Sequence, residues 1–411
     1  MNQKVLIIAS VWPEPNSSAA GSRMMQLIEL FLNEQWEITF ASPANNSDYS
    51  YDIESIGVAK VNIQLNSASF DDFIKELQPA IVLFDRFLVE EQFGWRVTEN
   101  CPDALKILDT EDLHCLRQSR QKAFKEKRAY RHNDLLTADI AKREIASILR
   151  CDISLIISSV EMELLKTIFK IDSSLIYYLP FMLDPISEEA IRTLPAYEER
   201  SNFISIGNFL HEPNWNAVLF LKEELWPLIR KKLPKAELHV YGAYPSQKVT
   251  ALHQPKYGFL IKGRAESVKN VMTNAKVCLA PLRFGAGIKG KLIDAMQYGT
   301  PNVTTSIGAE AMHGDLAWNG FITDTAEDFA NKAVELYDNK DIWQRSQKYG
   351  VQIINVCYPK KSAGLAFIKK IETLQASLKE HRTHNFMGNL LQHHTTLSTK
   401  YMSKWIEEKN K

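Results

Sequence analysis

The stretch "VCLAPLRFGAGIKGKLIDAMQYGTP" (277–301) decides which fold the chain can adopt. Its first six residues are an apolar run, which is typical of a parallel strand that is buried on both faces. Glycines follow at positions 285, 287 and 290, and a short helical pattern then runs until Gly299 and Pro301 end it. A strand that leads through glycines into a helix predicts an anion site. Glycine lets the backbone approach the anion closely, and the helix end supplies free N–H groups.

Strand and helix patterns alternate along most of the chain. One series starts with the apolar run at 4–10, and a second starts at 202–208, after a polar linker that contains prolines. The 411 residues are too many for one hydrophobic core. We therefore predict an α/β protein with two Rossmann-like, doubly wound domains. Their predicted bounds are 1–185 and 200–355, followed by a helix at 356–378 and a polar tail at 379–411.

Two known phosphate-binding patterns fit the opening stretch only in part. A P-loop, G-x-x-x-x-G-K-[ST], needs a hydroxyl at its last position to hold Mg²⁺, and this chain has Leu292 there. A dinucleotide fingerprint, G-x-G-x-x-G, matches the three glycines, and Glu310 follows at about the 20-residue spacing that this fingerprint requires. That fingerprint belongs after the first strand of a domain, whereas this stretch comes late in the second series.

The composition argues against several classes of protein. Lys and Arg together number 49, as do Asp and Glu, and a chain with no net charge is a poor match for nucleic acid. The five cysteines are widely spaced without a C-x-x-C pair, which argues against disulfides and structural zinc and indicates a reducing compartment. No run of about 18 apolar residues occurs, and the apolar N-terminal run has no cleavage site. We expect a cytoplasmic protein.

The residues around the glycines carry a resemblance to a known family. The segments "SIGNFLHEPNW" to "HVYG" (205–242) and "IKGRAESVKN" to "GAEAM" (261–312) strongly resemble the nucleotide-binding half of family-4 (group 1) glycosyltransferases. The N-terminal half is less similar, through the loop at Gly21, "DTEDLHCLR" (109–117) and "SSVEMELL" (158–165). The resemblance implies the GT-B architecture, in which two Rossmann-like domains face a central cleft. It also implies that the helix at 356–378 crosses back to the N-terminal domain.

The family binds a sugar nucleotide with a segment G-x-G-I-K-x-K-x-x-E-A-M. The resemblance implies the same roles for the matching residues of this chain. Gly285 and Gly287 would come close to the diphosphate, Lys289 and Lys291 would lie near the phosphates, and Asp294 would receive the ribose hydroxyls. A carboxylate in the first turn of a helix is able to accept two hydroxyl hydrogen bonds. The resemblance implies these donor-binding residues: Gly21, Arg23, Gly207, Asn208, Arg264, Gly285, Gly287, Ile288, Lys289, Lys291 and Asp294.

The chain departs from the family pattern at three positions. Asp294 is one methylene shorter than the family's glutamate, and Ala286 stands where many members have another glutamate. The family's T-H-D triplet, whose histidine lies near the reacting sugar, is replaced by T-E-D, so that Glu111 takes the place of the histidine. Glu111 and Asp112 either position sugar hydroxyls or only cap their loop. With Lys289 they are the candidate catalytic residues.

Two further features have two interpretations each. Asn214 either caps a helix that starts near Trp215 or contacts the substrate. The segment 117–131 contains seven Lys or Arg residues and one acid, Glu126. It is either a solvated helix face or a patch for an anionic acceptor, such as a lipid diphosphate at the inner face of a membrane.

Together these features predict a glycosyltransferase that moves a sugar from an NDP-sugar donor to a glycan, a glycolipid or another lipid-linked acceptor. The chain has no D-x-D motif, so we expect no metal and no cofactor, with a helix end and basic side chains neutralising the leaving diphosphate. The resemblance implies retention of the anomeric configuration. The alternatives are a nucleotide-dependent oxidoreductase and an inactive scaffold of the same fold.

Overall fold

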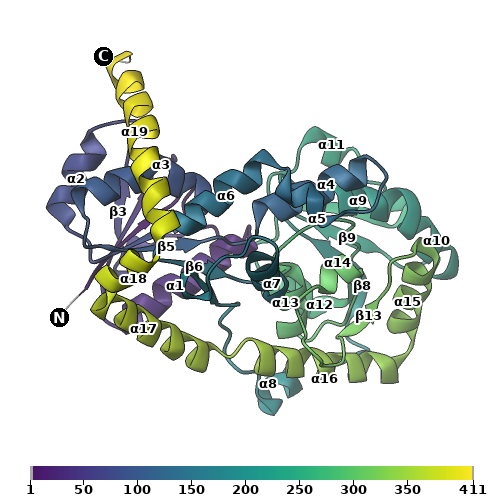
Figure 1. The fold of residues 1–411 in the computed structure, drawn as a ribbon. Coiled ribbons are helices and arrows are strands. Elements are labelled where there is room, and N and C mark those ends of the chain that lie inside the picture. The colour runs from purple at the N-terminus through teal and green to yellow at the C-terminus, as the bar shows by residue number, and fades with distance from the viewer. Residues whose placement is uncertain (1–2, 410–411) are drawn as a thin grey trace.

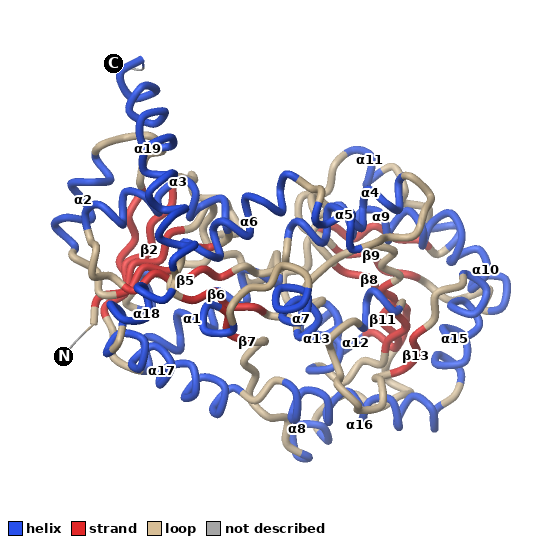
Figure 2. Tube along the Cα trace, viewed as in Figure 1, coloured by secondary structure: helices blue, strands red, loops and turns tan. Residues whose placement is uncertain are grey.

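The computed structural model describes residues 3–409, apart from the side chains at 396 and 397. Figure 1 shows two α/β domains side by side, with a long helical segment running beneath both of them. Each domain has a central sheet with helices on both faces, as Figure 2 shows. This confirms the predicted α/β class with two Rossmann-like domains.

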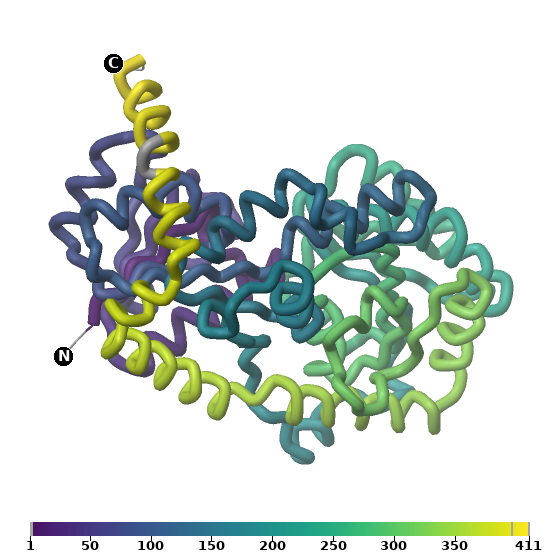
Figure 3. Tube along the Cα trace, in the orientation of Figure 1, coloured from purple at the N-terminus to yellow at the C-terminus, as the bar shows by residue number. Residues whose placement is uncertain are grey.

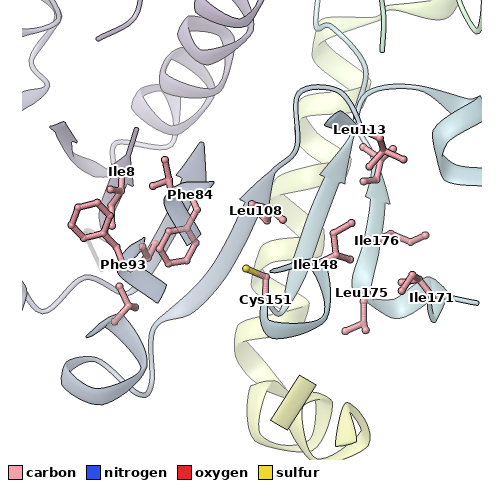
Figure 4. Packing of buried hydrophobic residues seen from close by; sticks show 14 of the residues in the cluster. Ile8, Phe84, Phe93, Leu108, Leu113, Ile148, Cys151, Ile171, Leu175 and Ile176 are labelled. Carbon is pink, nitrogen blue, oxygen red and sulfur yellow. The ribbon is translucent and has the colours of Figure 1, made fainter. Parts of the chain in front are cut away.

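All strands of the N-terminal sheet are parallel, and their order is β3-β2-β1-β4-β5-β6-β7. Both faces are buried: Leu6 and Ile8 of β1 belong to one hydrophobic cluster, and Val5 and Ile7 belong to the other. Figure 4 shows the first cluster, where Ile8, Phe84 and Phe93 pack together. The strands are β1 (Lys4–Ile8), β2 (Glu37–Ser42), β3 (Ala59–Asn62), β4 (Ile81–Asp85), β5 (Leu105–Asp109), β6 (Ile153–Ile156) and β7 (Ile176–Tyr178).

The helices of this domain follow the predicted pattern, except that the polar region 115–150 is divided among three helices. Two short 3₁₀ turns, η1 (Glu54–Ile56) and η2 (Ser173–Leu175), complete it. The helices are α1 (Ala19–Asn33), α2 (Ser69–Leu77), α3 (Phe87–Asn100), α4 (His114–Lys125), α5 (His132–Leu136), α6 (Asp139–Arg150) and α7 (Ser159–Thr167).

The C-terminal sheet repeats the arrangement with the order β10-β9-β8-β11-β12-β13, again parallel. Its strands are β8 (Ser201–Ile206), β9 (Leu238–Tyr241), β10 (Phe259–Gly263), β11 (Ala275–Ala280), β12 (Asn302–Thr304) and β13 (Gly320–Ile322). Its helices are α9 (Glu212–Phe220), the π-helix η3 (Leu221–Leu225), α10 (Trp226–Lys232), α11 (Gln247–Thr250), η4 (Pro255–Tyr257), α12 (Val268–Asn274), α13 (Gly290–Gln297), α14 (Ser306–Ala309), α15 (Ala326–Asp338) and α16 (Lys340–Cys357).

Two connections between the domains lie side by side. The first passes Leu183 and includes the short helix α8 (Glu188–Arg192), and the second returns through Pro359. The Leu183 N–H donates to the carbonyl of Tyr358 at 2.9 Å, and the Lys360 N–H donates to that of Leu183 at 3.0 Å. Helix α17 (Lys360–Ala376) then packs on the N-terminal domain, where Phe367 joins the cluster of Phe31.

The tail at 379–411 differs from a free polar segment, because it folds as α18 (Leu378–His384) and α19 (Phe386–Lys409) on the N-terminal domain. Residues 410–411 lie outside the described part. The Arg382 guanidinium bonds both carboxylate oxygens of Asp152 at 2.7 Å, which anchors α18. Figure 3 shows the chain's yellow end running up the outside of this domain. Within residues 3–409, no helix is long and apolar enough to cross a membrane.

Candidate functional site

A cavity of about 660 Å³ lies between the two domains. The loops that line it follow the carboxyl ends of strands in both sheets, which is where open α/β sheets bind ligands. Its volume is in the range of small-molecule sites. The lining includes Ser17 and Ser18 from the first loop, Arg86, Glu111, Asp112, His114 and Arg117 from the N-terminal domain, and Gly207, Asn208, His211, Asn214, Gly285, Gly287, Ile288, Lys289, Lys291 and Asp294 from the C-terminal domain.

Two glycines of the opening stretch lie where the C-terminal domain contacts the N-terminal domain. Gly287 has φ 64°, and a Cβ there would lie 2.8 Å from the Cβ of Asp112. A Cβ on Gly290 would lie 2.5 Å from that of Ala19. The Gly287 N–H already donates to Glu161 Oε1 at 2.8 Å. These glycines are explained by the close approach of the two domains, and the Gly287 amide is engaged by Glu161.

Two helices direct their N-terminal ends toward the cavity. Gly290 begins α13 and touches Ala19, the first residue of α1, so the two ends meet at the boundary between the domains. The first N–H groups of an α-helix have no partner within the helix, and they carry the positive end of its dipole. An anion in the cavity would therefore be favoured from both domains.

The side chains of Lys289 and Lys291 are both shielded from water. Lys289 caps α13 and donates from Nζ to the carbonyl of Gly287 at 2.8 Å, whereas Lys291 donates from Nζ to Asn214 Oδ1 at 2.6 Å. Burial lowers the pKa of each to about 8. Both ammonium groups hydrogen-bond neutral oxygens, although Asp294 lies near Lys291 and Glu310 near Lys289. An anionic ligand would favour their charged forms, because it replaces interactions that were lost with water.

Asp294 lines the same wall one turn along α13. Burial raises its pKa to about 7, although Lys291 opposes this shift. Within the described residues, no group donates a hydrogen bond to its carboxylate. The carboxylate is thus placed to accept hydrogen bonds from a ligand.

Gly207 and Asn208 lie next to these groups at the end of β8. A Cβ on Gly207 would lie 2.8 Å from Lys291 Nζ, so glycine is needed for the lysine to reach its place. The Asn214 amide bridges the Asn208 carbonyl, at 3.0 Å, and Lys291. The capping interpretation of Asn214 is wrong, because α9 begins at Glu212 with His211 as its N-cap.

On the N-terminal wall, Glu111 has an unusual environment. Its backbone has φ 61°, in the left-handed region that glycine favours, and its Oε1 is buried without a partner. Burial raises the pKa of Glu111 well above its ordinary value, and Asp109 adds to the shift. A strained residue with an unpaired polar atom in a cavity is typical of a functional position.

Asp112 differs from Glu111, because its pKa is lowered and not raised. Burial acts to raise its pKa, but Arg117 and His114 outweigh this and hold the pKa below its ordinary value. Its Oδ2 lies 2.8 Å from Arg117 Nε. Burial lowers the pKa of His114 and of His211 to about 4, so both rings are neutral near pH 7. Asp112 is therefore ionised and engaged at the boundary between the domains, whereas Glu111 is available.

Three predicted residues do not line the cavity. Gly21 is explained by packing, because a Cβ there would lie 2.5 Å from the backbone of Glu14. Arg23 is fully buried and bonds the Asp109 carboxylate at 3.2 and 3.3 Å. Arg264 lies over the ring of Tyr49, with 4.3 Å between its guanidinium carbon and the ring centroid.

The sequence analysis did not single out Arg86 and Glu161. Arg86 follows β4 and lines the cavity with φ 71°, and Glu161 joins Leu113 and Gly287 by accepting both of their N–H groups on Oε1. Burial raises the pKa of Glu161 to about 8. Arg86 follows the apolar strand "AIVLFD" directly. This position could have identified Arg86 as a site residue, because ligands bind at such strand ends.

Part of the basic segment 117–131 faces the other domain. Arg120 donates to both oxygens of Glu310 at 2.7 Å and to the Gly285 carbonyl at 2.9 Å. Arg117 is engaged by Asp112, and Arg128 bonds Asp134 at 2.8 Å. On the opposite side of the cavity, the Tyr244 hydroxyl donates to the carboxylate of Glu14 at 2.8 Å. The two domains are thus held together on both sides of the cavity.

Comparison with known proteins agrees with this geometry. Residues 200–339 match the family model described as "Glycosyl transferases group 1". The chain carries a group 1 glycosyltransferase domain in a GT-B fold. This match covers β8 to α15 and so includes the opening stretch. For this domain the match supports the predicted glycosyltransferase family.

Solved structures similar to this chain share its fold at low sequence identity. Sucrose-phosphate synthase from Thermosynechococcus elongatus matches with a TM-score of 0.65 and 14% identity over 92% of this chain and 100% of that chain. HepE from Anabaena, in complex with UDP and glucose, matches with a TM-score of 0.65 and 11% identity over 90% and 99%.

A third similar structure is a TarM variant from S. aureus in complex with Fondaparinux, alpha-GlcNAc-glycerol and UDP. It matches with a TM-score of 0.55 and 15% identity over 74% of this chain, and this chain spans 58% of the length of that chain. No curated protein sequence matches the chain.

Proposed function

We propose that the cavity binds an NDP-sugar on its C-terminal wall and presents the sugar to an acceptor on its N-terminal wall. The observation that carries this proposal is the grouping of Lys289, Lys291, Asp294 and the start of α13 on one side of the cavity. Cationic side chains and a helix end suit a diphosphate, and an unpaired carboxylate suits the hydroxyls of a ribose.

The phosphates lie between the N-terminal ends of α13 and α1 in this proposal. Lys289 turns from the Gly287 carbonyl to the phosphate nearest the sugar, and Lys291 stays with Asn214 beside the other phosphate. As the bond from the anomeric carbon to the phosphate oxygen breaks, negative charge grows on that oxygen. The helix ends and Lys289 stabilise this charge in a site that excludes water.

The acceptor hydroxyl approaches from the side of Arg86 and Glu111. Glu111 carries an unpaired oxygen and a raised pKa, so it is largely protonated where an ordinary glutamate is ionised. It is able to donate as well as accept a hydrogen bond, which suits a sugar hydroxyl. In this proposal the reaction is retaining and needs no metal, and the acceptor is a glycan or a glycolipid.

A panel of UDP-, GDP-, ADP- and dTDP-sugars tested by thermal shift, with NADH and NADPH alongside, examines this proposal. We expect at least one NDP-sugar at millimolar concentration to raise the melting temperature, because a ligand that binds only the folded state stabilises it. The dinucleotides should have no effect. If no nucleotide sugar shifts the melting temperature, the proposed donor site is wrong and the inactive scaffold gains support.

A further inference from the structure

Helix α19 buries a mostly polar side and exposes large apolar residues. The residues that face the domain are mostly small or polar: Gly388 and Ser403 are buried, the Gln392 amide donates to the Arg150 carbonyl at 2.7 Å, and Ile406 is a partly buried apolar residue among them. A Cβ on Gly388 would lie 2.1 Å from the Leu149 carbonyl oxygen, so glycine lets the helix lie directly on α6. The Ser403 hydroxyl bonds Asn66 at 3.2 Å.

The outer side of the same helix carries the large hydrophobic side chains. Six of the eighteen exposed large hydrophobic residues in the described part of the chain lie on α19. At 3.6 residues per turn they fall within an arc of about 160° and along about 29 Å of the helix. They are Phe386 (71% exposed), Met387 (53%), Leu390 (39%), Tyr401 (62%), Met402 (59%) and Trp405 (60%).

This arrangement is the reverse of an ordinary surface helix, whose apolar stripe faces the core. The exposed apolar residues form two groups on one side of the helix, Phe386 to Leu390 and Tyr401 to Trp405, and exposed apolar groups of this kind mark surfaces that another body covers. Figure 1 shows that α19 runs along the outside of the N-terminal domain and that its final turns extend beyond it. The outer face is therefore accessible to a large flat partner.

The charged residues of α18 and α19 indicate which kind of partner fits the exposed side of α19. The 26 residues from His381 to Ile406 contain no Asp or Glu, while Lys404 is exposed beside the aromatic side chains. The next carboxylate, Glu407, turns inward and accepts the Ala68 N–H at 3.0 Å, whereas Glu408 and Lys409 are both exposed in the last turn. The face therefore combines apolar and aromatic groups with two lysines, Lys404 and Lys409, and one carboxylate, Glu408.

We propose that the outer face of α19 docks on an anionic lipid surface, with the helix lying in the plane of the headgroups. Tyr and Trp favour the boundary between lipid and water, because their rings are apolar and their polar atoms stay hydrated. Amphipathic helices with lysine and aromatic residues bind membranes in this way, and anionic headgroups attract lysine. A second copy of the chain is a poorer occupant, since it would bring its own Lys404 and Lys409 against the same two lysines of this face.

This surface differs from the basic segment 117–131, whose Arg117, Arg120 and Arg128 are engaged within the protein. The membrane contact is thereby placed on the C-terminal helix. The proposal is independent of the donor site, so each can fail without the other.

Sedimentation with extruded vesicles tests the proposal on the full chain. One set contains 30 mol% phosphatidylglycerol in phosphatidylcholine, and the other contains phosphatidylcholine alone. We expect the wild type to sediment with the anionic vesicles and much less with the neutral ones. The double variant Tyr401→Ser/Trp405→Ser should lose at least tenfold in partitioning, and Lys404→Glu should weaken binding to the anionic set only.

The matched control is Tyr257→Ser/Leu365→Ser, which removes two similarly exposed side chains elsewhere and should bind as the wild type does. Circular dichroism and NDP-sugar binding verify that each variant is folded. Three outcomes overturn the proposal: no sedimentation with anionic vesicles, an unchanged double variant, or equal binding to both sets. A wild-type dimer in analytical ultracentrifugation that the double variant abolishes would also overturn it, in favour of a second copy.

Discussion

The C-terminal wall of the cavity carries two buried lysines and a helix end, whereas the N-terminal wall carries a crowded group of carboxylates. Burial lowers the pKa of Lys289 and Lys291 on the first wall. On the second wall burial raises the pKa of Glu111, and Asp109, which is buried behind the wall, adds to the shift. The first wall is therefore ready for an anion, and the second offers hydrogen bonds to neutral hydroxyls. In the proposed function, this difference places the donor diphosphate on one wall and the acceptor on the other.

The largest effect is expected from Lys289→Ala on the C-terminal wall. Removing a cation that stabilises the leaving phosphate should lower kcat/KM by about 100-fold or more, in the range found for lost groups that stabilise transition-state charge. Steady-state turnover of the NDP-sugar measures it. The exposed Lys348→Ala on α16 is the control and should leave the rate unchanged. A variant with near-normal kcat/KM would remove Lys289 from the mechanism.

Asp294→Asn should weaken donor binding by about 10-fold, because hydrogen bonds to a charged group contribute about 1.5–3 kcal/mol and the amide accepts less strongly. Isothermal titration with the NDP-sugar, without acceptor, measures the effect directly. The exposed Asp315→Asn controls for the loss of a charge. Unchanged affinity would show that the ribose binds elsewhere.

The pH dependence of donor affinity tests the charges of Asp294, Lys289 and Lys291 on the same wall. The pKa of Asp294 is about 7, so its carboxylate ionises and binding strengthens as the pH rises through 7. The pKa values of Lys289 and Lys291 are about 8, so both lysines lose their charge and binding weakens as the pH rises further. We expect affinity to be highest between about pH 7 and 8. In Asp294→Asn the rise on the acidic side should disappear, and its persistence would contradict the assignment.

Glu111→Leu tests the role of Glu111 on the N-terminal wall. Leucine has a similar size but makes no hydrogen bond, so we expect acceptor KM to rise several-fold, about 1 kcal/mol for one hydrogen bond. Donor affinity should stay the same, which separates this variant from Asp294→Asn. Equal losses for donor and acceptor would mean that the two walls do not divide the substrates.

Arg120→Ala should have the smallest effect. It removes the bidentate contact with Glu310 and the bond to Gly285, so the domains separate more easily. We expect about a threefold loss of donor affinity, since an ion pair that is partly exposed contributes about 1 kcal/mol or less. Small-angle scattering should show a larger radius of gyration. Lys122→Ala, on the same helix, should show neither change.

The two walls also differ in how far the sequence predicts them. Gly285 to Asp294 lie within ten residues of one stretch, so its strand–glycine–helix pattern predicted an anion site and the family resemblance picked out Lys289, Lys291 and Asp294, all of which line the cavity. Arg86 and Glu111 follow different strands, and only the strand order brings them together. The predicted contact role of Arg23 also depended on the fold, because its guanidinium points inward to Asp109.

The docking of the C-terminal tail on the N-terminal domain was also not predicted from the sequence. Its sequence is polar enough to suggest a segment without a core, and the prediction of a polar tail rested on that composition. The structure places its small and polar residues against α3 and α6, where Arg96 and Ser403 bond across the contact at 3.2 Å. Periodicity of apolar residues could not reveal this docking, because the buried face of α19 is mostly polar.

Hydrogen exchange in the presence of the NDP-sugar alone tests the division of the cavity most directly. The account predicts strong protection of peptides covering 288–298, since the free N–H groups at the start of α13 bind the diphosphate. Peptides covering 106–116, around Glu111, should change little until the acceptor is added. Donor protection at 106–116 with none at 288–298 would contradict the account.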